Sequence, residues 1–129
     1  MLLGNQQQMA YSNVQVQANA SVSNSFELIF MLHERLDQEI DVMIFAIENH
    51  DLEKKSLAAQ KAIDILTALD SSLDLNNSNE LINNIHNLYE YSIREIFKAS
   101  KDLDVSYLLE LKQPLADLKE GWQGLMNQQ

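Results

Sequence analysis

Apolar side chains recur at intervals of three and four residues in four separate stretches of the chain, and this spacing places them along one face of an α-helix. The first such stretch covers residues 29–47, and three more follow between residues 52 and 125. Short polar segments separate the stretches, such as residues 76–80. Long helices joined by short turns pack as antiparallel neighbours. The sequence therefore predicts an all-α fold, an antiparallel up-down four-helix bundle.

The expected bundle spans residues 24–126, with helices at about residues 25–50, 52–74, 79–101 and 105–126. Short polar side chains at a helix start accept a hydrogen bond from the first turn. The expected N-caps are Asn24, Asp51, Ser78 and Asp104. Residues 1–23 are instead rich in Gln, Asn, Ser and Ala. We expect a mobile or loosely docked N-terminal segment there, not a second domain.

The charge of the chain limits its partners. The 129 residues carry a formal net charge of −10 at pH 7. Nucleic acids and anionic membranes both need basic patches, so neither is expected as a partner. No apolar run approaches the ~20 residues of a membrane span, and the N-terminus lacks the basic region of a signal peptide. Because the chain also has no cysteine, we expect a cytoplasmic protein without disulfides or thiolate metal sites.

No pattern of catalytic or metal-binding residues is present. A di-iron site in a bundle needs Glu-x-x-His pairs, but the residues three positions before the three histidines are Phe30, Ile47 and Asn83. A phosphotransfer histidine is equally disfavoured, because acidic neighbours would repel a phosphoryl group. No serine, lysine or carboxylate constellation indicates catalysis, and no Gly-rich loop could hold phosphate. We expect no enzyme, no cofactor and no metal.

Apolar residues also occur outside the core stripes. Tyr89 and Tyr91 lie two positions apart, and on a helix they point in directions roughly 200° apart. We expect Tyr89 to face the bundle and Tyr91 to face outward near Ile93. On the second helix a further line of small and apolar residues could leave a shallow groove. The residues predicted to form a docking surface are Ala58, Ile65, Ala68, Tyr91 and Ile93.

Two interpretations of this surplus remain open. The extra apolar residues could widen the bundle core or form the interface of a structural or regulatory homo-oligomer. Alternatively, several helices could share a docking surface for an amphipathic segment of another protein.

Several motifs in a fixed order favour the second interpretation. They are "AY" at residue 10, "ELIFML" at 27, "AIENHDLEKK" at 46, "KAIDILTALDSSLD" at 61, "LYEY" at 88 and a late Trp122. In this order the chain resembles the flagellar secretion chaperone FliS family over about residues 10–125.

The resemblance implies a cytoplasmic four-helix bundle that binds the C-terminal segment of flagellin. Such a chaperone prevents premature polymerisation and keeps flagellin competent for flagellar type III secretion. The family's N-terminal segment is expected to cover part of the binding surface as a lid. The apolar anchors of that lid would here be Met9, Tyr11 and Val14. Further partners to consider are the flagellar export gate and a second copy of the chain in a weak homodimer.

The chain also departs from the family pattern. Ser25 and Phe26 replace the Pro-Gly usual before "EL", and His33 replaces the tyrosine usual after "ML". Ile63 and Ser100 replace a glutamine and an asparagine. These changes are compatible with the bundle but leave open which flagellin is the client.

Overall fold

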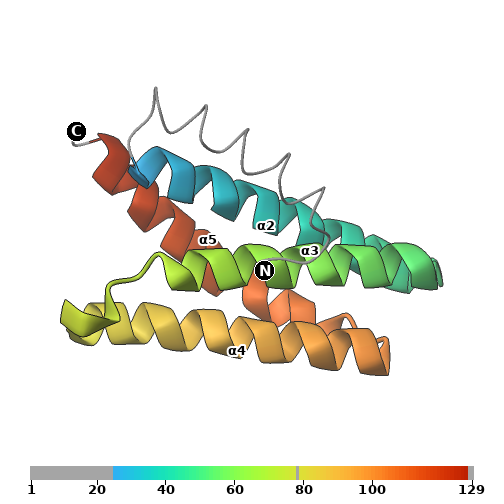
Figure 1. The fold of residues 1–129 in the computed structure, drawn as a ribbon. Helices are drawn as coiled ribbons and strands as arrows, with labels where there is room; N and C mark the ends of the chain where they lie inside the picture. The colour runs from blue at the N-terminus through green and yellow to red at the C-terminus, as the bar shows by residue number, and fades with distance from the viewer. Residues whose placement is uncertain (1–24, 78, 128–129) are drawn as a thin grey trace, which may run out of the picture.

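The computed structural model describes residues 25–77 and 79–127. Its helices are α2 (Ser25–Glu48), α3 (Leu52–Ser71), α4 (Glu80–Asp102) and α5 (Ser106–Asn127), with a short 3₁₀ helix, η1 (Leu75–Asn77), before α4. Successive long helices run in opposite directions (Figure 1). The main contacts join α2 to α3 and α5, and α4 to α3 and α5. The predicted all-α four-helix fold is confirmed.

The core consists of the side chains that the periodic spacing placed on one face of each helix. The fully buried large apolar residues are Leu36, Ile40, Met43, Leu66, Leu69, Tyr89, Ile96, Leu108 and Leu111. The spacing failed at two helix starts, where Leu52 and Leu81 were expected in the core but are 54% and 65% exposed. Both lie in the first turn of their helix.

Helix ends follow the capping chemistry in part. The Asp51 carboxylate accepts a hydrogen bond from the Lys54 amide at 3.1 Å, as expected of an N-cap. The cap of α4 is Asn79, whose side chain accepts from the Ile82 amide at 2.9 Å. The predicted caps Asn24 and Ser78 lie outside the described residues. Asn79 is the N-cap in place of Ser78 because α4 begins one residue later than expected.

Polar side chains connect the helices around the core. Lys112 of α5 donates to Asp37 and Asp41 of α2, both at 2.6 Å. Lys55 of α3 donates to the backbone oxygen and hydroxyl of Ser100 on α4, both at 3.1 Å. These connections fix which helix faces meet.

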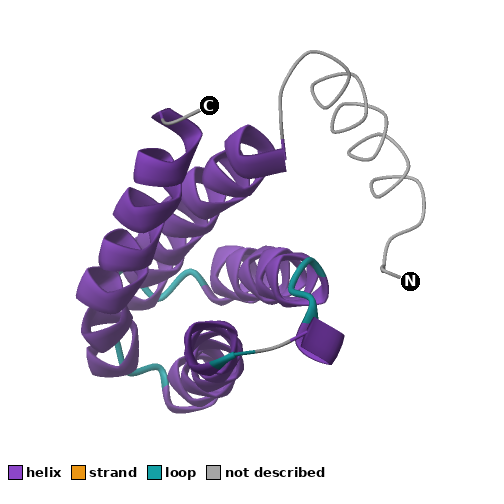
Figure 2. Ribbon diagram, turned by 90° about the vertical axis from the view of Figure 1, so that its left-hand side faces the viewer, coloured by secondary structure: helices purple, strands orange, loops and turns teal. Residues whose placement is uncertain are grey.

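The helices do not remain equally close along their length. α5 runs obliquely to α4, and the C-terminal end of α5 lies away from the start of α4 (Figure 1). The side view shows the same inclination of the helix that carries the C-terminus (Figure 2). Within residues 25–77 and 79–127, no helix combines the length and apolar character that a membrane span requires.

Candidate functional site

The sequence-predicted docking residues occupy different environments. Ala58 is only 2% exposed and lies in the core, so its prediction as a surface residue needs correction. It is buried because α2 and α3 pack closely along a row of alanines. Ile65 and Ile93 are half-buried, while Ala68 and Tyr91 are exposed.

The two tyrosines of α4 face as predicted. Tyr89 is buried, and Tyr91 is exposed. The pKa of the Tyr91 hydroxyl is raised, mainly by partial loss of contact with water. The negative charges of Glu95 and of Glu110 on α5 raise it further. Tyr91 therefore lies on the α5 side of α4.

Ile93 lies on a different side of α4 from Tyr91. His86 and Ser100 both bond to α3, and Ile93 stands seven residues from each, on the same helix face. Ile93 therefore faces α3. The structure does not bring Tyr91 and Ile93 together on one surface.

Ile65 and Ala68 also point away from α4. On α3, Asp70 bonds to α4, and a helix turns by about 100° per residue. Ala68 and Ile65 are therefore rotated roughly 160° and 140° from the direction of Asp70. Of the five predicted residues, Ala58 is buried in the core. The other four belong to at least two separate faces.

Apolar side chains do lie along α3 and α4 on the side where these two helices meet. Their register follows from the two polar connections, in which Lys55 meets Ser100 and Asp70 meets His86. Since the helices are antiparallel, Ile63 lies at about the level of Ile93. We call this set of side chains the α3–α4 face; it consists of Leu52, Ile63, Ile93 and Phe97.

Phe97 is the largest exposed group of the α3–α4 face. Its side chain is 59% exposed, and it lies four residues from Ile93 and three from Ser100. The spacing of seven, four and three from His86 through Ile93 and Phe97 to Ser100 defines one helix stripe. This spacing was readable in the sequence, but which stripe faces α3 was not.

A charged cluster ends the α3–α4 face. Nδ1 of His86 lies 2.6 Å from Oδ1 of Asp70, and its Nε2 lies 3.4 Å from Oε1 of Glu90. The hydrogen bond to Asp70 raises the pKa of His86, against a smaller lowering by desolvation. Among the described residues, no group of three or more His, Asp or Glu side chains could hold a metal ion.

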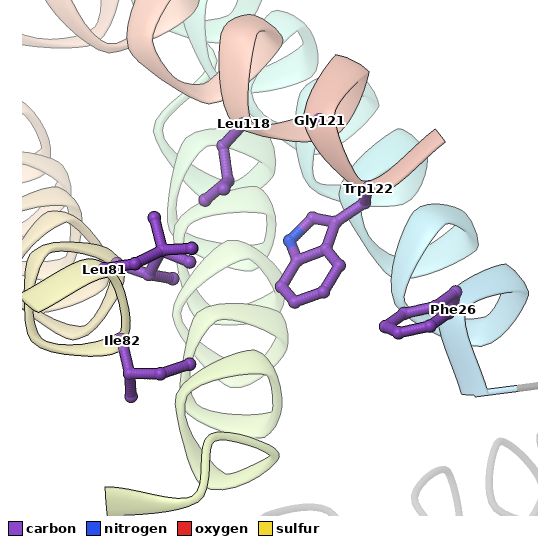
Figure 3. A pocket seen from close by; sticks show the side chains of 7 residues that line it. Phe26, Leu81, Ile82, Leu118, Gly121 and Trp122 are labelled. Carbon is purple, nitrogen blue, oxygen red and sulfur yellow. The ribbon is translucent and has the colours of Figure 1, made fainter. Parts of the chain in front are cut away.

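A cavity lies at the end of the bundle where α5 diverges from α4. It has a volume of about 400 Å³, and Phe26 of α2 and Trp122 of α5 form one wall, with ring centroids 5.7 Å apart. Figure 3 shows the indole projecting from α5 into the space between Leu81 and Phe26, with its nitrogen on the side facing Leu118 and Leu81. The remaining lining residues are Ile82, Ile85 and Gly121.

Three polar groups lie buried beside this cavity. The Tyr89 hydroxyl lies 2.9 Å from Nε2 of His33, and both side chains are buried. Burial raises the pKa of Tyr89 to about 12; the nearby Trp122 indole acts in the opposite direction. Within the described residues the buried Nε1 of Trp122 nevertheless forms no hydrogen bond. The indole N–H is thus near enough to favour the phenolate electrostatically without bonding to it.

The predicted lid residues Met9, Tyr11 and Val14 lie outside the described residues. The described fold begins at Ser25, one residue before Phe26 in the cavity wall. The N-terminal segment therefore joins the bundle beside the cavity.

Comparisons with known proteins agree with the motif order. A family model described as flagellar protein FliS matches residues 6–129. The flagellar secretion chaperone FliSB of Pseudomonas aeruginosa is 31% identical over 115 residues, which cover 89% of this chain and 91% of the relative. The flagellar secretion chaperones FliS of Salmonella typhimurium and Bacillus subtilis are each 28% identical, over 88% and 82% of this chain and 84% and 78% of their own lengths. The predicted resemblance is confirmed, and the chain belongs to the FliS family.

Proposed function

We propose that the protein is a cytoplasmic flagellar export chaperone that binds the C-terminal segment of flagellin. In this role it prevents premature polymerisation of its client and keeps it competent for flagellar type III secretion. The observation that carries the proposal is the α3–α4 face of a FliS-family bundle, on which Leu52 and Phe97 are exposed beside half-buried Ile63 and Ile93. An unfolded amphipathic client must bury apolar area to offset the entropy lost on ordering.

The α3–α4 face suits a client helix. Its apolar groups lie eleven residues apart on α3 and four apart on α4, spacings that each return to the same side of a helix, so a straight helix placed along them can contact them with one side. Phe97 provides a large exposed ring, and half-buried Ile63 and Ile93 provide a flat apolar base beside it. Of the docking residues predicted from the sequence, Ile93 is part of the α3–α4 face, whereas Ile65, Ala68 and Tyr91 belong to flanking faces.

Charge substitutions on three faces test where the client binds. Phe97→Asp should weaken binding of a synthetic flagellin C-terminal peptide by at least about tenfold, because a carboxylate would lose water on docking. Ala68→Glu on α3 and Phe45→Asp on α2 place the same charge on other exposed sites and should change the affinity little. Isothermal titration calorimetry measures the affinities, and circular dichroism confirms helicity.

The outcomes separate the competing sites and functions. A loss confined to Phe45→Asp would place the site on α2, and a loss confined to Ala68→Glu would place it on the outer side of α3. A tight dimer by light scattering that refuses the peptide would instead support the homo-oligomer interpretation.

The lid is the second part of the proposal. We expect the segment around Met9, Tyr11 and Val14 to compete with the client for part of its surface. Each anchor can contribute about 1.5–3 kcal/mol at most, less the entropy of ordering the segment, so its hold is weak. A weakly held lid lowers the client affinity only by the fraction of time it is closed.

Deleting residues 1–16 should leave the helicity unchanged, increase the binding of an apolar dye and tighten peptide binding modestly. The full-length chain is the control in the same calorimetric titration. If the shortened chain binds the peptide distinctly more weakly, the segment contributes contacts of its own and does not act as a lid.

A further inference from the structure

The charged end of the α3–α4 face is not electrically balanced. Two carboxylates, Asp70 on α3 and Glu90 on α4, face the single imidazole of His86. These are the groups whose charges act on His86 among the described residues. The cluster therefore carries at least one net negative charge, and two when His86 is neutral.

Docking of a client would remove water from this cluster. The side chains of His86 and Asp70 are each 25% exposed. A client helix that lies along Phe97 and Ile93 and continues in the same direction would cover this exposed part. Burying unbalanced charge is costly unless an opposite charge comes with the partner. Surface complementarity of this kind selects partners.

We propose that this end of the face selects a client helix carrying a lysine or arginine, positioned two helical turns beyond the apolar side chain that contacts Ile63 and Ile93. The inference rests on the proposed function and adds a specificity rule to it. Asp70 and His86 each stand seven residues from Ile63 and Ile93, a distance of roughly 10 Å along a helix. The basic side chain of the client thus occupies the same helix face as its apolar anchors and pairs with Glu90 and Asp70.

A double-mutant cycle tests the pairing. The probe is a synthetic peptide of the host flagellin's C-terminal segment, together with variants in which each Lys or Arg is replaced singly by Met. Calorimetry with the full-length chain compares wild type with Glu90→Gln. Glu90 is about half exposed and, among the described residues, pairs with His86 alone, so its replacement should leave the bundle intact. Glu48→Gln, at the exposed end of α2, removes one charge far from the cluster.

The cycle gives a distinct result if the pairing exists. Glu90→Gln should weaken binding about tenfold, and one Lys or Arg replacement in the peptide should weaken binding to wild type similarly. That same peptide variant should lose little further affinity for Glu90→Gln, whereas Glu48→Gln should behave as wild type. The proposal is overturned if the peptide binds and no basic position couples to Glu90. If wild type does not bind the peptide at all, the proposed function fails first.

The pH dependence gives a second readout. Raising the pH through the raised pKa of His86 removes its proton and leaves two carboxylates, so the affinity for the basic peptide should increase. In His86→Gln this increase should disappear, because the glutamine does not titrate. An affinity that falls with rising pH, or a dependence that persists in His86→Gln, contradicts the proposal.

Discussion

Ala58→Glu is expected to lower the free energy of unfolding by about 3–5 kcal/mol. The methyl group of Ala58 is 2% exposed and lies beside the buried Ala59 and Ala62 on α3. Glutamate brings four further heavy atoms into this closely packed region, and its charge has no partner there among the described residues. A typical domain is stable by only 5–15 kcal/mol, so a large part of the stability would be lost. Urea unfolding followed by far-ultraviolet circular dichroism measures the change.

Ala68→Glu is the matched control for this prediction. Ala68 lies ten residues further along the same helix and is exposed, so the same substitution should change the stability by less than about 0.5 kcal/mol. The comparison separates a buried from an exposed position on the same helix. Equal stabilities of the two variants would mean that α3 can rotate or shift to release the Ala58 side chain, and the packing described for α2 and α3 would then be wrong.

The fold could be predicted from the sequence because helix periodicity depends only on local spacing. The stripes with three- and four-residue intervals identified most of the core, including Leu36, Ile40 and Leu66. The sequence also indicated a non-enzymatic protein, which membership of the FliS chaperone family confirms. Errors occurred at helix starts, where Leu52 and Leu81 continue the spacing but are exposed, and Leu81 lines the cavity between α4 and α5.

The docking surface was harder to predict because it depends on how the helices are rotated against each other. A helical wheel shows that Tyr91 and Ile93 differ in direction, but not that Tyr91 faces α5 and Ile93 faces α3. The first assignment required the effect of the Glu110 charge on Tyr91, and the second required the bonds between Lys55 and Ser100 and between His86 and Asp70. Ala58 was misplaced for the same reason, since a line of small residues suits both a surface groove and close packing between helices.

Acidification should destabilise the bundle through His33. The side chain is 2% exposed, with Nε2 2.9 Å from the Tyr89 hydroxyl. Burial, and then the positive charge of Lys119, lower the pKa of His33 to about 4 from an ordinary value of 6.5. The folded chain therefore binds this proton more weakly than the unfolded chain does. The stability that neutral His33 provides is complete above pH 6.5 and is lost as the pH falls toward 4.

The expected loss is about 3 kcal/mol, since each unit of pKa shift corresponds to roughly 1.4 kcal/mol. His86 acts with the opposite sign: its raised pKa adds stability at low pH that is lost as the pH rises. Because the His86 side chain is partly exposed and solvent screens its charge, His33 should dominate between pH 6.5 and 4.5. Urea unfolding at several pH values, followed by the fluorescence of the single tryptophan, Trp122, measures this dependence.

His33→Gln isolates the contribution of the buried imidazole. The glutamine amide can still reach a hydrogen-bond partner, which spares the Tyr89 hydroxyl from being buried unpaired, and it cannot take up a proton. The variant should therefore be less stable than wild type at neutral pH but lose about 3 kcal/mol less on acidification. His50→Asn, at the exposed turn after α2, should follow the wild-type curve, since asparagine tolerates the positive φ of this position. If His33→Gln lost stability as steeply as wild type, the acid sensitivity would belong to other groups, and the buried pair with Tyr89 would contribute only packing.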